Sequence, residues 1–312
     1  MSNKQMVNDR KRTISFNEAL HRYTDEYGKT YTSVTTFLSE YEIPFDSDYW
    51  SKNKAAESGL SQSAVLQNWK QITIEACEKG NRIHKNLEDS INESTGKTKL
   101  IPINVKIDFN KPVDLDVLAS SPLGLKYPKI LFTLMHYVEQ GFVIYAEKRI
   151  YWAEILIAGT IDCLLVKGKQ FLILDWKTNK DDLVFKSGYF KKVNGIKTNQ
   201  WVDKKEYFKK PINNLEHCKG NKYVLQLSMY AFLMELWGFQ CIGLILFQIQ
   251  SKPVMLNNEY VIDQLSGNRL MKEVVTDYKI PYVKSSCELL YIDRKNALSP
   301  NKNINPSINF GL

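Results

Sequence analysis

The amino-acid sequence predicts an α/β fold in which a mixed β-sheet is flanked by helices, with a largely helical N-terminal region. Residues 142–178 contain three successive apolar runs separated by short turns, which is typical of strands. Apolar residues recur at helical spacing on both sides of these runs, in residues 48–93 and 222–237. Strands and helices that share a chain in this way pack as a sheet covered by helices.

The N-terminal part of the chain has elements of both kinds. Residues 13–37 alternate apolar and polar positions around a turn, which predicts a small hairpin leading into a helix. Residues 48–93 have helical spacing and end in a polar stretch, and residues 99–122, with several Pro and Asp, predict a loop. An amphipathic helix is expected over residues 124–140, and Gly141 ends it.

The sheet is expected to take its strands from four segments, residues 142–152, 154–166, 170–178 and 241–250. The third contains the continuous apolar run FLIL, which predicts a central strand buried on both faces. A helix over residues 222–237 precedes the last strand. Residues 180–222 interrupt the pattern as a long polar insertion.

Length and composition bound the class of protein. The 312 residues suffice for one large or two small domains, and 44% hydrophobic with 24% charged residues exclude disorder over most of the chain. We expect an N-terminal region over residues 1–123, a core over 124–284 and a C-terminal extension over 285–312. With no long apolar run, no secretory signal and 5 scattered cysteines, we expect a cytoplasmic protein with no membrane partner and no disulfide framework.

Two carboxylates and an ammonium group are expected to converge at one edge of the sheet. Asp162 lies in the second strand, whereas Asp175 and Lys177 end the third strand two residues apart and point to one face. Neighbouring carboxylates repel, and a divalent cation removes that repulsion. One or two Mg²⁺ or Mn²⁺ ions are therefore the expected cofactor, with Lys177 holding the attacking water in phosphodiester hydrolysis. In the alternative reading, these charges form a surface ion pair at a strand end.

With these residues in place, the chain resembles the PD-(D/E)XK nuclease superfamily over residues 80–249, and most closely its RecB-like exonuclease branch. The resemblance implies a restriction-endonuclease-like fold and metal-dependent DNA hydrolysis. It implies that Asp162 and Asp175 are the metal-binding acidic residues and that Lys177 is the catalytic lysine. Members with an iron–sulfur cluster carry four clustered cysteines, a spacing that this chain lacks, so no cluster is expected.

Further residues match motifs of that branch. A helical G-x-x-x-H motif implies that His84 is a metal ligand, and Glu147 stands where the branch often has an acidic ligand. The main-chain carbonyl of Trp176 is expected to complete the metal site. Gln226 and Tyr230, one helical turn apart, match a Q-x-x-x-Y motif, which implies a catalytic role beside the lysine or the substrate backbone. Each of these side chains has a purely structural alternative, as a surface or core residue.

The insertion concentrates the positive charge of the chain. The net charge is +8, and residues 180–222 hold 11 lysines and 5 acidic residues, a net charge of +6 with aromatic residues interleaved. Lysines neutralise phosphates, and aromatic rings stack on unpaired bases. The expected DNA-binding residues are Lys191, Lys192, Trp201, Lys204 and Lys205. The alternative is a solvated loop that its aromatic residues anchor to the body of the protein.

The predicted function is a metal-dependent DNA exonuclease that acts on single strands or duplex ends in recombination, repair or replication, including phage-type DNA processing. A structure-specific endonuclease, a non-catalytic nucleic-acid-binding accessory protein on a nuclease scaffold, and RNA as the substrate remain open. The sequence has no GxxxxGK[ST] loop for ATP, so a helicase or a recombination protein is a candidate partner. The expected location is the cytoplasm of a bacterium or of a phage-infected host cell.

Overall fold

The computed structural model describes residues 12–20, 22–96, 113–193, 196–257 and 259–299. The main sheet contains eight strands: β1 (Ile14–Asn17), β2 (Arg22–Asp25), β3 (Thr30–Ser33), β4 (Val143–Trp152), β5 (Ile157–Lys167), β6 (Gln170–Lys177), β9 (Gln240–Pro253) and β12 (Met271–Ile280). Their order is β1-β2-β3-β5-β6-β9-β12, and β4 pairs with β5. The β3–β5 and β6–β9 pairs are parallel and the others antiparallel, which confirms the predicted mixed sheet.

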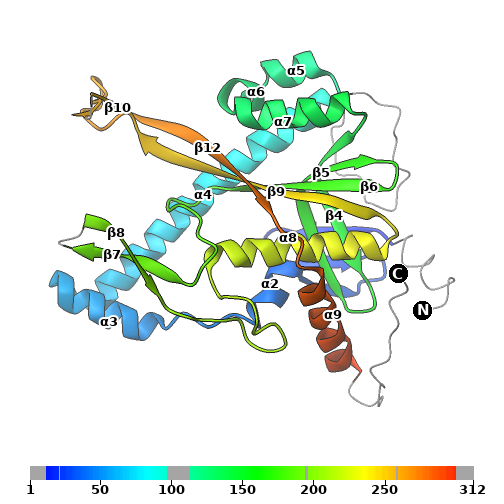
Figure 1. The fold of residues 1–312 in the computed structure, drawn as a ribbon, viewed down its shortest axis with the longest axis horizontal. Coiled ribbons are helices and arrows are strands. Elements are labelled where there is room, and N and C mark those ends of the chain that lie inside the picture. The colour runs from blue at the N-terminus through cyan, green and yellow to red at the C-terminus, as the bar shows by residue number, and fades with distance from the viewer. Residues whose placement is uncertain (1–11, 21, 97–112, 194–195, 258, 300–312) are drawn as a thin grey trace.

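Helices cover both faces of this sheet (Figure 1). They are α2 (Val34–Ser39), α3 (Ser47–Ser58), α4 (Gln62–Ser94), α5 (Leu115–Ser120), α6 (Pro122–Lys126), α7 (Pro128–Glu139), α8 (Lys219–Leu236) and α9 (Lys284–Leu298). In Figure 1, α5 to α7 lie above the sheet, whereas α2, α8 and α9 lie below it. Within the described ranges, no helix is long and apolar enough to cross a membrane.

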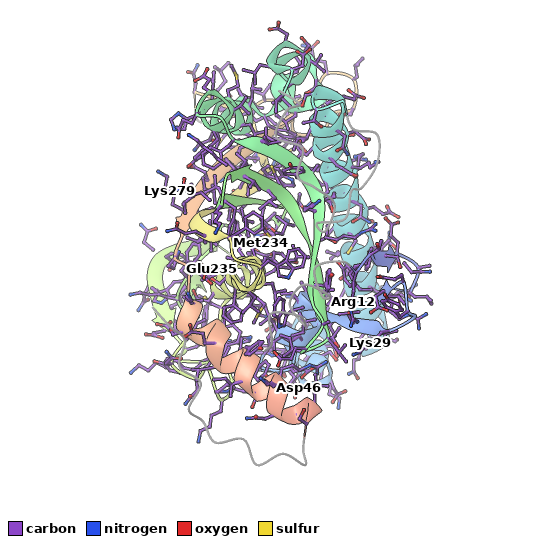
Figure 2. The ribbon with its side chains drawn as sticks, turned by 90° about the vertical axis from the view of Figure 1, so that its right-hand side faces the viewer. Arg12, Lys29, Asp46, Met234, Glu235 and Lys279 are labelled. Atoms are coloured by element: carbon purple, nitrogen blue, oxygen red, sulfur yellow. The ribbon has the colours of Figure 1, made fainter. Side chains whose placement is uncertain are left out.

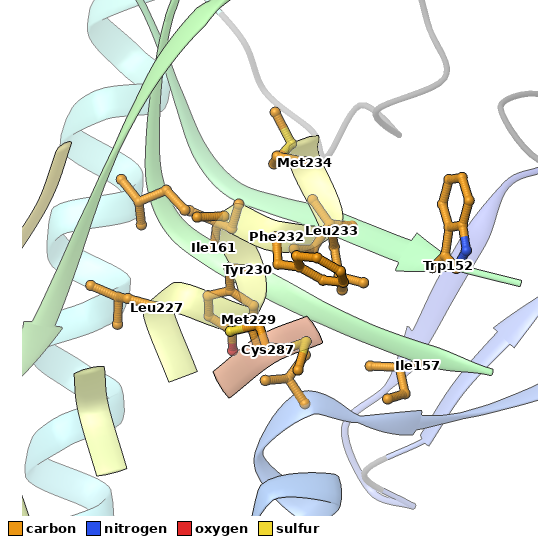
Figure 3. Packing of buried hydrophobic residues seen from close by; sticks show 14 of the residues in the cluster. Trp152, Ile157, Ile161, Leu227, Met229, Tyr230, Phe232, Leu233, Met234 and Cys287 are labelled. Atoms are coloured by element: carbon orange, nitrogen blue, oxygen red, sulfur yellow. The ribbon is translucent and has the colours of Figure 1, made fainter. Parts of the chain in front are cut away.

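The central position predicted for the third strand is confirmed. Strand β6 lies between β5 and β9, and its residues 171–176 are buried. Alternation sends Phe171 and Ile173 into the apolar cluster on the α8 side, and Leu172 and Leu174 into the cluster under α4 and α7. Figure 3 shows the α8 side of the sheet, where Leu227, Tyr230 and Leu233 gather with Ile157 and Ile161 of β5.

The helical stretch predicted over residues 48–93 is two helices. Gly59 ends α3 with φ 70°, in the left-handed region that glycine adopts without steric cost. The Ser61 hydroxyl then accepts a hydrogen bond from the main-chain N–H of Ala64 and starts α4. Glycine and a capping serine together override the continuous apolar pattern.

The loop predicted over residues 99–122 is wrong in the part that the structure describes. Asp114 caps α5 by accepting two main-chain N–H bonds, and Ser121 caps α6, which has Pro122 in its first turn. The Asp and Pro residues of this stretch therefore begin helices. Its earlier residues, 99–112, lie outside the described residues.

Several elements outside the predicted set complete the fold. Strand β12 pairs along β9, and α9 packs against α8 with Cys287, Leu290 and Tyr291 in the same apolar cluster. Two small sheets accompany the main one: β7 (Gly188–Val193) with β8 (Ile196–Asp203), and β10 (Met255–Leu256) with β11 (Glu259–Tyr260). The β7–β8 hairpin gives the basic insertion a folded part.

On the side away from β4, strand β5 pairs with two different strands along its length. Residues 157–158 pair with β3, residues 163–167 pair with β6, and residues 159–162 lie between these two ladders. A Cβ atom on Gly159 would lie 2.5 Å from Cε1 of Tyr230, so only glycine admits the tyrosine ring there. This interruption near the middle of the sheet is where the candidate site forms.

Candidate metal centre

Three of the predicted metal ligands meet at the interrupted ladder. His84 comes from α4, Glu147 from β4 and Asp162 from β5, and each offers one ligand atom within 4.8 Å of the others. All three side chains are half-buried. Residues far apart in the sequence thus supply one nitrogen and two carboxylates to a single point.

Helix α4 brings His84 to the end of β6. A Cβ atom on Gly80 would lie 3.2 Å from Oγ1 of Thr178, so the glycine marks a close approach of helix and strand. One turn later, His84 Nε2 lies 3.1 Å from the main-chain oxygen of Trp176. A carbonyl only accepts, so Nε2 donates this bond, and a neutral ring with the proton on Nε2 has its lone pair on Nδ1, 3.5 Å from Asp162 Oδ2. A lone pair and a carboxylate in this arrangement can share a cation.

Asp162 is held by the neighbouring strand. The β5–β6 ladder ends at the pair of Cys163 with Leu174. Beyond it, the main-chain N–H of Trp176 donates a hydrogen bond of 3.0 Å to Asp162 Oδ2. The carboxylate therefore takes the place of the next ladder partner, which fixes its position at the opening.

Glu147 reaches the cluster through an unusual backbone conformation. Its φ is 46°, in the left-handed region that residues with a side chain rarely adopt, while the residues on either side keep their pairing with β5. Burial, followed by the negative charges of Asp162 and Glu88, raises the pKa of Glu147 to about 9. The cluster is therefore short of positive charge, the condition in which a cation binds well.

Asp175 is not part of this trio and is instead paired with the lysine. It is 1% exposed, and its Oδ2 lies 2.6 Å from Lys177 Nζ. Burial raises the pKa of Asp175 to about 6, although Lys177 opposes the shift. Among the described residues, Asp175 Oδ1 is buried and has no hydrogen-bond partner. A buried acceptor without a donor is an atom that a cation would satisfy.

The ammonium group of Lys177 stays charged in these surroundings. Burial alone would lower its pKa, but the charges of Asp175 and Asp162 outweigh burial and leave the pKa above its usual value. The Nζ atom also lies 4.7 Å from the ring centre of Tyr223 on α8, a cation–π contact. Lys177 therefore keeps its proton at neutral pH and can act as a charged hydrogen-bond donor.

Gln226 and Tyr230 contact each other on the same helix. Gln226 Nε2 donates a hydrogen bond of 3.1 Å to Tyr230 Oη, and the tyrosine is buried with its ring against Gly159. Tyr223, one turn earlier on α8, contacts Lys177. A direct catalytic role for the Gln–Tyr pair remains a prediction.

Two residues near the cluster were missed by sequence reasoning. Glu88 lies one turn after His84 on α4, is half-buried and contributes to the raised pKa of Glu147. Tyr223 donates a hydrogen bond of 3.2 Å to Asn179 Oδ1 in addition to its contact with Lys177. Helical spacing could have predicted both, because each lies three or four residues from a residue that the motifs identify and so shares a helix face with it.

Two buried glutamines of β9 hold the chain that follows Lys177. Gln248 Nε2 donates to the main-chain oxygens of Asn179, at 3.2 Å, and Asp181, at 2.7 Å. Gln250 Nε2 donates to the main-chain oxygen of Lys180 at 2.9 Å. Both glutamines are at most 2% exposed. Polar residues at alternate positions of an apolar strand are the sequence signal for this clamp.

Gln248→Leu should therefore loosen the segment after Lys177. Two partly buried main-chain hydrogen bonds are lost, so the free energy of unfolding should fall by about 1–3 kcal/mol, measured by urea denaturation. Gln240→Leu, at the exposed start of the same strand, is the matched control and should change it little. Equal stability of the two variants would show that the clamp contributes nothing.

A cleft of about 970 Å³ opens onto the cluster. It is bounded by α4, β1 and the end of β6, and its lining includes His84, Glu147, Trp176, Lys177 and Glu88. In Figure 2, Arg12 and Lys29 mark the N-terminal strands, which lie next to α4. The cleft therefore gives a ligand access to His84 and Glu147 of the trio and to Lys177 at once.

The five predicted DNA-binding residues lie elsewhere. Lys191 and Lys192 are exposed on β7, and Trp201 on β8 packs its ring against Phe190 at 5.0 Å between ring centres. Lys204 and Lys205 follow β8 and are exposed. In the part of the chain that the structure describes, none of the five lines the cleft. Their role in DNA binding remains a prediction.

The sequence matches no protein-family model. No curated protein matches the sequence either.

Proposed function

We propose that the protein is a metal-dependent deoxyribonuclease that hydrolyses phosphodiester bonds from the end of a DNA strand, on a restriction-endonuclease-like sheet. The observation that carries the proposal is the trio of His84, Glu147 and Asp162 beside the buried pair of Asp175 and Lys177. The preference for strand ends, and DNA as the substrate, come from the resemblance to RecB-like exonucleases.

The residues of the site fit Mg²⁺ or Mn²⁺. His84 Nδ1 and the carboxylates of Glu147 and Asp162 would hold the ion, with Asp175 Oδ1 as a further ligand. The carbonyl of Trp176 would hold the ring of His84 from its other nitrogen, Nε2. Carboxylates suit both ions, and a nitrogen ligand favours Mn²⁺. When bound, the ion would polarise the scissile phosphate and lower the pKa of a bound water.

Lys177 would assist as a hydrogen-bond donor. Its raised pKa keeps Nζ protonated at neutral pH, so it would orient the attacking water or stabilise the negative charge that develops on the phosphate. Asp175 and Tyr223 would hold Nζ in place from two sides. The residues of the chain itself thus supply orientation and charge stabilisation around the reacting phosphate.

The test uses end-labelled single-stranded DNA, linear and circular, with Mg²⁺, Mn²⁺ or EDTA. Wild type is compared with Asp175→Ala and with Asp181→Asn, an exposed carboxylate just after the site as the matched control. We expect stepwise loss of the linear strand only, dependent on metal and on Asp175 but not on Asp181. Cutting of the circle would indicate an endonuclease, and tight binding without any cleavage would indicate a non-catalytic accessory protein.

A further inference from the structure

The cleft beside the candidate metal centre has an apolar half that the hydrolytic residues do not use. Helix α4 lines one side of it with Ile72, Ala76 and Cys77, and Phe16 of β1 also lines it. Ile72 is 55% exposed. Apolar surface left open beside a reactive site is typical of a surface that a ligand covers.

This apolar wall leads directly to the metal cluster. Ile72, Ala76, Gly80 and His84 recur every four residues on α4, so they lie along one side of the helix. At 1.5 Å per residue, the stripe from Ile72 to His84 is about 18 Å long. A chain-like ligand with one end at the trio would therefore run over the apolar part of the helix.

Phe16 packs against a tyrosine that is hydrogen-bonded to the strand of the site. Its ring centre lies 4.5 Å from that of Tyr23, and Tyr23 Oη is 2.9 Å from Oγ1 of Thr160, two residues before Asp162. These contacts place the phenylalanine ring near the strand that carries the carboxylate. An aromatic ring that borders a cleft can act as a stacking surface.

Charge is distributed unevenly along the cleft. The charged side chains of Lys85, Glu88, Glu147 and Lys177 border it where α4 approaches β4 and β6, and the exposed Glu18, just after β1, also lines it. A nucleic acid strand also has a charged part and an apolar part, namely its phosphate backbone and the faces of its bases. Within a duplex these faces are covered by neighbouring pairs, whereas an unpaired base can stack on a protein ring.

We infer that the apolar half of this cleft binds unpaired nucleobases, with one base stacked on Phe16, and that the substrate is a single-stranded DNA end. The identity of the ligand rests on the proposed nuclease function. A base between Phe16 and Ile72 would place the next phosphates of the strand toward Lys177 and the trio. Duplex DNA would have to unpair its end before it could occupy the same position.

The test is fluorescence anisotropy in the presence of Mg²⁺, with the full chain carrying Lys177→Met so that the strand is cut too slowly to disturb the binding measurement. Phe16→Leu keeps an apolar side chain but removes the ring. We expect it to weaken binding of a single-stranded oligonucleotide on the order of tenfold, within the range for one stacked base, and not to change binding of a blunt duplex. Phe132→Leu, an exposed ring on α7, is the matched control and should leave both affinities unchanged.

A second arm uses oligonucleotides with single abasic positions near the end. One abasic position should reproduce the loss in the protein that keeps Phe16. The same abasic position should cost nothing further in the Phe16→Leu variant, because that variant has no ring on which the base could stack. Unchanged single-strand affinity of Phe16→Leu, or equal affinity for the blunt duplex and the single strand, would overturn the inference. Failure of the unmutated chain to bind or cut any DNA would instead contradict the proposed function itself.

Discussion

Lys177→Met should reduce DNA cleavage by about a hundred- to a thousandfold, the effect of removing one positioned donor from a reacting centre. The variant keeps an unbranched side chain of similar length but loses the ammonium group that lies 2.6 Å from Asp175 Oδ2. The trio of His84, Glu147 and Asp162 is untouched, so metal binding should persist. Single-turnover cleavage at saturating protein measures the chemical step separately from DNA affinity.

The matched control for this variant is Lys180→Met, which removes an exposed lysine three residues further on. It should cut at the rate of wild type. Lys177→Met should also raise the pKa of Asp175 further, because that buried carboxyl loses the cation that opposes its shift. Cleavage by Lys177→Met within threefold of wild type would remove the lysine from the mechanism.

Glu147→Gln should stabilise the metal-free protein, and the gain should grow with pH. The folded-state pKa of Glu147 is about 9, well above its unfolded value, so wild type has to take up a proton on folding between these two pKa values. Below about pH 4.5, Glu147 is protonated in both the folded and the unfolded state, and wild type has its full free energy of unfolding. Part of that free energy is lost as the pH rises toward 9. Glutamine is neutral throughout. At pH 8 the melting temperature should rise on the order of 2–5 °C, with almost no difference near pH 5.

Adding Mn²⁺ should make wild type melt at a higher temperature than Glu147→Gln. An ion at a hundredfold excess over its dissociation constant stabilises the folded state by about 2.7 kcal/mol, and the variant has lost one of the ligands. Thermal unfolding at pH 8, with EDTA or Mn²⁺, measures both effects. Glu139→Gln, at an exposed position of α7, is the matched control and should follow wild type. Equal stabilisation of all three proteins by Mn²⁺ would place the ion elsewhere.

Local sequence patterns were sufficient to predict the strands around the site. The apolar run in β6 and the alternation in β4 and β5 predict strands because each strand meets apolar surface along most of its length. Patterns failed where one backbone conformation decided the outcome, as at Gly59 between α3 and α4. They also gave no sign of α9, whose buried residues Cys287, Leu290 and Tyr291 belong to the apolar cluster that includes α8.

The sequence by itself determined the chemical content of the site. Asp175 and Lys177 lie on one face at the end of a buried strand because side chains alternate in a strand, whatever the rest of the chain does. The G-x-x-x-H spacing likewise places Gly80 and His84 on one side of α4. These are local consequences of strand and helix geometry, so they can be deduced without a structure.

Only the tertiary structure decided which of these groups lie together. It joins His84, Glu147 and Asp162 and leaves Asp175 paired with Lys177. That division depends on the kink at Glu147 and on the close approach of α4 at Gly80. Both arise from contacts between segments far apart in the chain, and such contacts follow from the packing of the whole sheet rather than from any local pattern.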